Sequence, residues 1–209
     1  MTAHAASGPA APGGNGKGRS HGPTKENPAP GAGPFGLAIF LVSLAVLFLG
    51  SLIAYAVIRS RAPAWPPPGL PRVPSGLRIS TAILALASVS LEWAARSLRP
   101  YRPAPFRVAI AVSLAAGLGF LISQCFAWVA FVQAIPHATL YSWLFLFLTG
   151  LHAAHVLGGL VPLVIVTVKA FHGLIPTAPG GGDVRATATY WHFLGLVWVT
   201  LYGMLLLTT

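Results

Sequence analysis

The chain has 209 residues, of which 55% are hydrophobic and only 8% are charged. A soluble domain usually carries about 25% charged residues, so the composition excludes an ordinary soluble protein and indicates a membrane protein. Thirteen lysines and arginines oppose three acidic residues and give a formal charge of +10. Loops beside membrane spans collect basic residues, which explains this excess, and we expect no nucleic acid partner.

The first 34 residues differ in composition from the rest of the chain. Residues 1–34 are rich in glycine, proline and alanine and contain no apolar core. This composition predicts a disordered tail. We do not expect a cleavable signal, because the segment has no short apolar region before a small-residue cleavage site. Residues 35–209 then form the membrane domain.

Five apolar segments follow the tail. Each is long enough to cross a hydrocarbon layer of about 30 Å as a helix. Runs of this length favour helices over the shorter alternating segments of a barrel. The sequence therefore predicts an all-α, polytopic membrane protein, a bundle of five transmembrane helices. The predicted spans are 35–58, 79–98, 106–132, 140–171 and 188–208.

The basic residues predict an orientation. With the N-terminus inside, nine lysines and arginines lie on the inner side and four on the outer side. This asymmetry favours N-in and, with five spans, C-out. The inner residues are Lys17, Arg19, Lys25, Arg96, Arg99, Arg102, Arg107, Lys169 and Arg185, and the outer residues are Arg59, Arg61, Arg72 and Arg78.

Few polar residues in the spans could carry chemistry. Glu92 stands four residues before Arg96, the order that favours an ion pair within a helix. A role of Glu92 in carrying protons is the alternative. The single cysteine, Cys125, predicts a small packing residue, because it can form no disulfide within the chain.

Three histidines, His152, His155 and His192, fall inside predicted spans. They could bind a metal, contact protons or lipid, or lock helices together by hydrogen bonds, and the last is our interpretation. His155 and His192 fall at similar depth on neighbouring spans, so a bond between them is geometrically feasible. If they do not bond to each other, a hydroxyl or a backbone carbonyl is the expected partner.

Further inter-helix contacts are predicted close to these histidines. Gly158 and Gly159 are small enough to let helix backbones approach each other. Trp191 and Trp198 are seven residues apart and share one helix face, which indicates a packing stripe or an interfacial anchor. Four arginines predicted on the inner side are candidate contacts for anionic phospholipid: Arg96, Arg99, Arg102 and Arg107.

Four stretches resemble subunit III of the haem–copper oxidases, the cytochrome c and quinol oxidase family. They are WPPPG (65–69), STAILALASVSLEWAARSL (80–98), TGLHAAHVLGG (149–159) and YWHFLGLVWVTLY (190–202). The first resembles the family's Trp-Pro-Pro loop, and the last two resemble its Thr-Gly-x-His-x-x-His-Val segment and its Tyr-Trp-His-Phe helix. Five spans suit the shorter form of the family, which lacks the first two helices of the longer members.

The chain departs from the family pattern at three intramembrane positions. Leu44, Ala127 and Gly195 stand where the family commonly has an acidic residue. The resemblance implies that those acids connect to proton uptake or to structure between subunits. We therefore leave open whether this chain has a proton-related role.

The resemblance implies a non-catalytic subunit of a terminal oxidase in a bacterial inner membrane. Haem and copper are then expected in the partner subunits I and II and not in this chain, with phospholipids as further partners. An accessory subunit of nitric oxide reductase or of a quinol oxidase is the alternative within the family. A stand-alone transporter would need more polar residues at the midplane than the chain offers.

Overall fold

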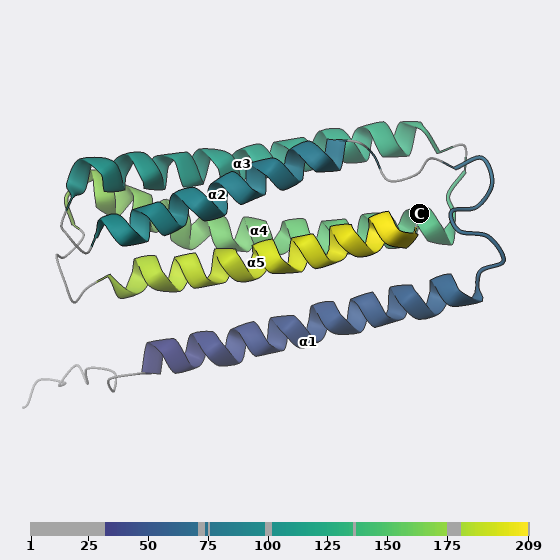
Figure 1. The fold of residues 1–209 in the computed structure, drawn as a ribbon, viewed down its shortest axis with the longest axis horizontal. Coiled ribbons are helices and arrows are strands. Elements are labelled where there is room, and N and C mark those ends of the chain that lie inside the picture. The colour runs from purple at the N-terminus through teal and green to yellow at the C-terminus, as the bar shows by residue number, and fades with distance from the viewer. Residues whose placement is uncertain are drawn as a thin grey trace, which may run out of the picture.

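The computed structural model describes residues 32–70, 74, 76–98, 102–135, 137–174 and 181–208. These residues form five helices, with no strand among them (Figure 1). Each helix is long and apolar enough, by length and composition, to cross a membrane, as predicted. The helices are α1 (Ala32–Arg61), α2 (Gly76–Ser97), α3 (Pro103–Gln133), α4 (Leu140–Phe171) and α5 (Gly182–Thr208).

The helix ends follow local sequence signals. α1 begins at Ala32, slightly earlier than predicted, because a proline such as Pro34 is tolerated in the first turn. α4 begins with a reciprocal cap: the Thr139 side chain accepts a hydrogen bond from the Ser142 amide, and the Ser142 hydroxyl accepts one from the Thr139 amide. α4 also continues through Pro162. The predicted tail, residues 1–34, lies largely outside the described residues, which begin at residue 32.

The helices run along the long axis of the molecule and alternate in direction (Figure 1). The start of α1 therefore shares an end of the bundle with the α2–α3 and α4–α5 connections, and the C-terminus lies at the other end. α2 packs on α3 and α5, and α4 packs on α3 and α5. Within the described residues α1 contacts only α4 and α5, so it flanks a group of four helices.

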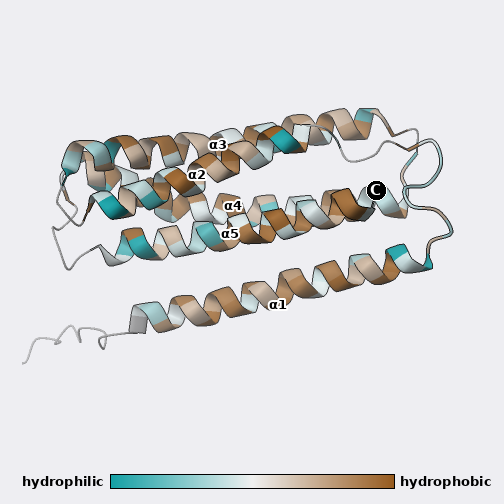
Figure 2. Cartoon of the chain, in the orientation of Figure 1, coloured by the Kyte–Doolittle hydropathy of each residue, from teal (hydrophilic) through white to brown (hydrophobic). Residues whose placement is uncertain are grey.

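The surface of the bundle is largely apolar. Figure 2 shows hydrophobic residues along the length of α1, with hydrophilic residues concentrated toward the helix ends. Many large apolar side chains face outward, among them Phe126 and Trp143. Such a surface suits lipid tails or other membrane helices.

The core between the helices contains large aromatic residues and small polar ones. Trp191 and Trp198 are completely buried, so the pair forms a packing stripe and does not anchor the helix at an interface. Serines join α2 to α3: the hydroxyls of Ser90 and Ser113 are 2.8 Å apart, and Ser80 and Ser123 are 2.7 Å apart. Small side chains and hydroxyl contacts are typical of close helix packing in membranes.

Candidate functional site

The α4–α5 contact brings together two of the stretches singled out in the sequence, residues 149–159 and 190–202. The Tyr190 hydroxyl donates a hydrogen bond to the His155 carbonyl at 2.9 Å, and Trp191 Nε1 donates one to the Gly159 carbonyl at 3.1 Å. Both bonds run from a side chain of α5 to the backbone of α4. They fix the register of the two helices at the level of the histidine–glycine segment.

Two glycines make this contact sterically feasible. A Cβ built on Gly159 would lie 2.6 Å from Tyr190 Cε1, and a Cβ on Gly117 of α3 would lie 2.6 Å from Trp191 Cη2. Real Cβ atoms essentially never come that close. The aromatic pair on α5 therefore occupies space that only glycine leaves free. Gly158 is less crowded, since its Cβ would come no nearer than 4.0 Å to the Tyr190 hydroxyl.

His152 lies in the centre of the bundle and is completely buried. Its ring is surrounded by other rings, with centroids 5.0 Å away for Trp198, 5.7 Å for Phe120 and 6.2 Å for Phe48. These rings come from α5, α3 and α1, so His152 contributes to the contact between four helices. Its nitrogens have no hydrogen-bond partner within the described residues.

His155 faces a different part of the bundle. Its Nδ1 lies 2.7 Å from the Leu151 carbonyl, and its ring packs edge-on against Phe48 of α1 at 5.1 Å. It also lines a cavity of about 540 Å³ between α1, α4 and α5, whose wall includes Phe40, Pro162 and Tyr190. Of the partners left open by the sequence, the structure shows the backbone carbonyl.

His192 contacts α2, and the described residues show no hydrogen bond between it and His155. Its Nε2 lies 3.5 Å from Glu92 Oε2, and Glu92 Oε1 lies 2.7 Å from Arg96 Nε. The predicted Glu92–Arg96 pair is thus confirmed, but sequence analysis missed the third member. Part of the signal was available, because Glu92 lies in the second half of α2 and His192 in the first half of α5, and these halves share one end of the bundle.

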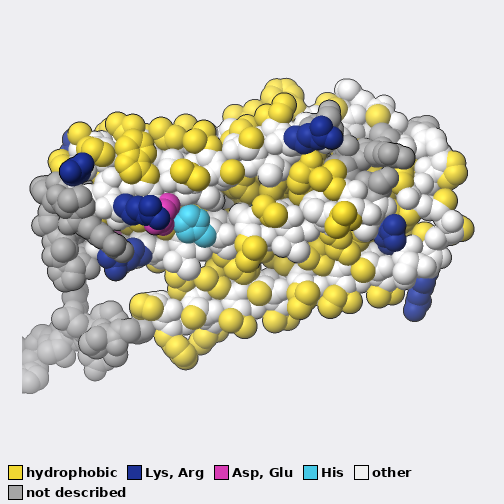
Figure 3. Space-filling view, viewed as in Figure 1, with side chains coloured by type: hydrophobic (Ala, Val, Ile, Leu, Met, Phe, Trp, Pro, Cys, Tyr) yellow, Lys and Arg dark blue, Asp and Glu magenta, His cyan; other side chains and the backbone are white. Residues whose placement is uncertain are grey.

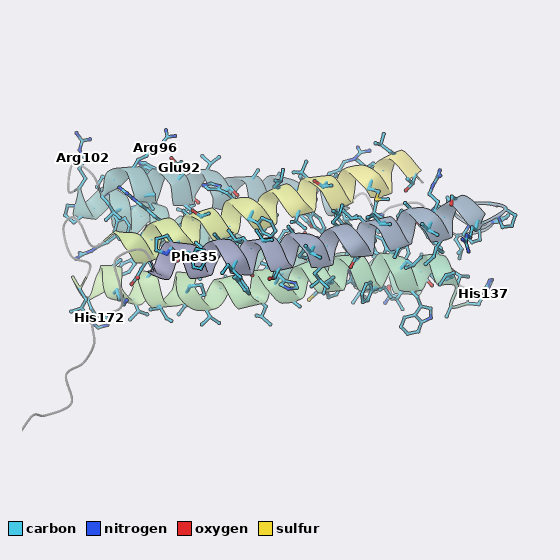
Figure 4. The ribbon with its side chains drawn as sticks, turned by 90° about the horizontal axis from the view of Figure 1, so that it is seen from below. Phe35, Glu92, Arg96, Arg102, His137 and His172 are labelled. Atoms are coloured by element: carbon cyan, nitrogen blue, oxygen red, sulfur yellow. The ribbon has the colours of Figure 1, made fainter. Side chains whose placement is uncertain are left out.

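The cluster of Glu92, Arg96 and His192 lies on the exposed surface of the bundle. Figure 3 shows an acidic side chain between a basic one and a histidine on an otherwise largely apolar face. Glu92 and His192 each keep 42% of their side chain exposed. Figure 4 places Glu92, Arg96 and Arg102 along one edge, near the end where Phe35 lies, with His137 at the opposite end.

The four arginines predicted to contact lipid differ in the partners that their side chains have within the protein. Arg96 pairs with Glu92, and Arg107 Nε donates to the Ala170 carbonyl at 3.0 Å. Arg102 is exposed at the N-cap of α3. Arg99 lies outside the described residues.

The WPPPG stretch lies at the other end of the bundle. Trp65 Nε1 donates to the Tyr55 hydroxyl at 3.0 Å, and that hydroxyl lies 2.7 Å from Thr208 Oγ1. The Trp65 ring also packs edge-on against Tyr141 at 5.2 Å. The peptide bond between Trp65 and Pro66 is cis. The loop therefore links the end of α1 to the start of α4 and the end of α5.

The three positions that depart from the family pattern face other helices. Leu44 is buried with 6% of its surface exposed, and Ala127 with 5%. A Cβ on Gly195 would lie 3.3 Å from Ser88 Oγ. Within the described residues these interior positions therefore bear apolar or absent side chains.

Among the described residues, no group of three or more histidine, cysteine, aspartate or glutamate side chains is arranged to hold a metal ion. Cys125 is exposed, so its prediction as a packing residue was wrong. It sits on the outward face of α3, one residue after the buried Gln124.

Comparison with known proteins agrees with this architecture. Residues 27–207 match the family described as cytochrome c oxidase subunit III. Cytochrome c oxidase subunit 3 of Synechocystis sp. is 30% identical over 169 residues, covering 80% of this chain and 72% of that protein. The same subunit of Osphranter robustus is 30% identical over 176 residues, covering 80% of this chain and 66% of that protein. The Mus musculus subunit is 28% identical over 177 residues, with the same coverage of 80% and 66%.

The motifs quoted from the sequence lie inside the matched range, and Tyr190 and Trp191 of the last motif bond to the backbone of α4. Together, the match over most of the chain and the five-helix membrane architecture show that this multi-pass membrane protein belongs to the cytochrome c oxidase subunit III family.

Proposed function

We propose that this chain is the non-catalytic subunit III of a haem–copper terminal oxidase of the cytochrome c oxidase type. It would lie in a bacterial inner membrane, pack beside subunits I and II, and stabilise the complex during aerobic electron transport. Haem and copper would be held by the partner subunits. The chain would contribute helix surface, bound lipid and the local environment of its neighbours.

The observation that carries this proposal is that the motif residues pack and hydrogen-bond within the helix bundle. Tyr190 and Trp191 bond to backbone carbonyls of α4, Trp65 bonds to Tyr55, and His152 lies inside an aromatic cage. These side chains are committed to the interior of the bundle. The use of these motif side chains in contacts between helices supports a structural role for the chain within a larger enzyme.

Purification of the tagged chain from native membranes tests the proposal. We expect two further membrane subunits to purify with it, together with a haem absorption spectrum. After mild dissociation the haem and copper should remain with the partners and leave this chain. A chain that purifies alone, or that keeps stoichiometric haem or copper after separation, would contradict the assignment.

The N-in, C-out orientation is part of the proposal. In the described residues, the end of the bundle that holds the start of α1 carries five basic residues, and the opposite end carries three. This difference supports an inner location for the first end. The five are Arg96, Arg102, Arg107, Lys169 and Arg185, and the three are Arg59, Arg61 and Arg78. A reporter enzyme that works only outside the inner membrane, fused after residue 209, should show activity. If instead a reporter that works only in the cytoplasm shows activity at this position, the orientation is the reverse.

We also propose that the inner basic residues attract anionic phospholipid. Arg102 offers the cleanest test, because its side chain makes no cap hydrogen bond and is exposed. Arg102→Gln should weaken retention of anionic phospholipid by about 1 kcal/mol, the contribution of one charge near a membrane surface. Native mass spectrometry of the purified complex measures this. Arg61→Gln, at the opposite end of the bundle, is the matched control, and equal losses in both variants would reject a specific inner site.

A further inference from the structure

Two polar side chains in the centre of the bundle are unexplained by the helix contacts described above. Gln124 of α3 and His152 of α4 have no exposed surface. The amide nitrogen and oxygen of Gln124 and both ring nitrogens of His152 lack a hydrogen-bond partner within the described residues. No other buried side-chain polar atoms in the described part of the chain share this condition.

The register of α3 and α4 places these two side chains at the same level. Phe120, Gln124 and Trp128 follow one another at intervals of four residues and so lie on one face of α3. The Phe120 ring contacts the His152 ring at 5.7 Å, and Trp128 Nε1 donates to Thr149 Oγ1 at 3.0 Å. On α3, Gln124 lies between Phe120 and Trp128, which make these two contacts. On α4, the partners of these contacts, His152 and Thr149, are one turn apart. Gln124 and His152 therefore lie at the same level of the α3–α4 pair.

The polar side chains near the pair have hydrogen-bond partners of their own, and in the described residues none of them bonds to Gln124 or His152. Thr149 donates its hydroxyl proton to the Phe145 carbonyl at 2.7 Å and already accepts from Trp128. Trp198 Nε1 is bonded to Thr81 Oγ1 at 2.9 Å. The rings of Phe48 and Phe120, which also contact the His152 ring, offer no oxygen or nitrogen.

The depth of the pair makes unsatisfied groups costly. Gln124 is about 14 Å from the end of α3 and His152 about 18 Å from the start of α4, both near the middle of a core about 30 Å thick. Lipid tails cannot supply hydrogen bonds there. An unpaired amide or imidazole in such surroundings costs several kcal/mol, whereas a buried water molecule typically makes two to four hydrogen bonds to groups of this kind.

We propose that Gln124 and His152 form an internal hydration site that holds one or two ordered water molecules between α3 and α4. A water molecule there accepts a hydrogen bond from the Gln124 amide nitrogen and donates one to an unprotonated nitrogen of His152. The site joins the middle of two helices that also meet through aromatic rings and through the Trp128–Thr149 hydrogen bond. This inference does not depend on which complex the chain joins, because it concerns groups within the chain alone.

An experimental map of the purified complex tests the site directly. At a resolution that reveals ordered water on the polar ends of the same helices, we expect density within hydrogen-bond distance of both Gln124 and His152. Two outcomes would overturn the proposal: a direct hydrogen bond between the two side chains, or no density at the pair while surface waters are visible. Neither outcome bears on co-purification with partner subunits, so the two proposals fail separately.

Paired variants provide a second test. Gln124→Leu and His152→Phe should each lower the unfolding temperature of the purified complex, because each leaves a polar group without the shared water. The double variant should lower it by less than the sum of the single effects, since both polar groups are then gone. Strictly additive shifts would contradict a shared site.

The exposed residues Gln133 and His137 supply the matched control. Gln133→Leu and His137→Phe make the same chemical changes near the α3–α4 connection, where water is accessible. We expect little shift from either and no coupling between them. Coupling of the same size in this control pair would show that the effect at the centre does not report a shared water.

Discussion

α1 and α4 have similar lengths, 30 and 32 residues, and both are strongly apolar, yet they relate differently to the bundle. In the most apolar window of each helix, 11% of α1 is buried inside the protein against 44% of α4. α4 contains glycines, histidines and a threonine at the positions where it meets other helices. In a membrane, apolar side chains alone give helices little reason to associate, because lipid is equally apolar. Small and polar residues therefore decide which helix is central.

α1 is attached to the bundle at a few positions. Leu44, Phe48 and Tyr55 are buried along one narrow line, whereas neighbouring residues such as Val46 are exposed. Its polar connections lie at its end, where Tyr55 contacts Thr208 and the Arg59 side chain donates to the Thr208 carbonyl at 3.2 Å. The remaining surface of α1 is free to face lipid or a partner subunit.

The largest expected effect comes from filling the α4–α5 contact. In Gly159→Leu the Cβ alone would overlap the Tyr190 ring at 2.6 Å, so α5 must move away from α4. We expect loss of the folded bundle, and with it loss of this subunit from the purified complex. Subunit stoichiometry after purification measures the effect.

Gly150→Leu is the matched control on the same helix. A Cβ at Gly150 meets nothing within 4 Å, so the same substitution should leave stoichiometry unchanged. If Gly159→Leu assembled normally, close packing would not be what makes α4 central, and the contrast with α1 would lose its physical basis.

A smaller effect is expected at the point where α1 is best buried. Phe48 is only 2% exposed and packs against the rings of His152 and His155. Phe48→Ala removes a ring from this contact and should lower the free energy of unfolding by about 3 kcal/mol. Titration with a denaturing detergent measures the change. Val46→Ala, at a position 66% exposed, should cost far less, and equal losses would mean that α1 has no preferred face.

The contrast between the helices also explains what the sequence could and could not predict. All five spans follow from the length of apolar runs, and most of their bounds in the structure lie within three residues of the predicted ones. The exception is α5, which begins at Gly182, six residues before the predicted start, because the polar first turns of a helix carry no apolar signal. The faces of α1 could not be predicted, since apolar residues occur on all sides of it. On α4 and α5, small and aromatic residues at helical spacing indicated contact positions, and in the structure Trp191 Nε1 donates to the Gly159 carbonyl.

Partners of individual side chains were harder to predict than helices. Depth alone suggested that His155 and His192 could meet, but depth does not fix the direction in which a side chain points around its helix. His155 turns toward α1, and His192 turns toward Glu92 of α2. Cys125 failed for the same reason, because an apolar run does not distinguish an inward position from an outward one.

The smallest expected effect concerns a single hydrogen bond across the α4–α5 contact. Tyr190→Phe removes the bond to the His155 carbonyl and keeps the ring that packs against Gly159 and stacks on Phe40 at 5.9 Å. Hydrogen bonds between membrane helices contribute about 0.6 kcal/mol on average and rarely more than about 1.7 kcal/mol. We therefore expect a loss of about 0.6 kcal/mol in the same detergent titration. Tyr202→Phe is the control on α5, because Tyr202 contributes a ring stacked on Trp198 at 6.2 Å. A loss well above about 2 kcal/mol in Tyr190→Phe would show that the bond does more than fix the register of α4 and α5. An equal loss in Tyr190→Phe and Tyr202→Phe would show that the bond does not fix the register.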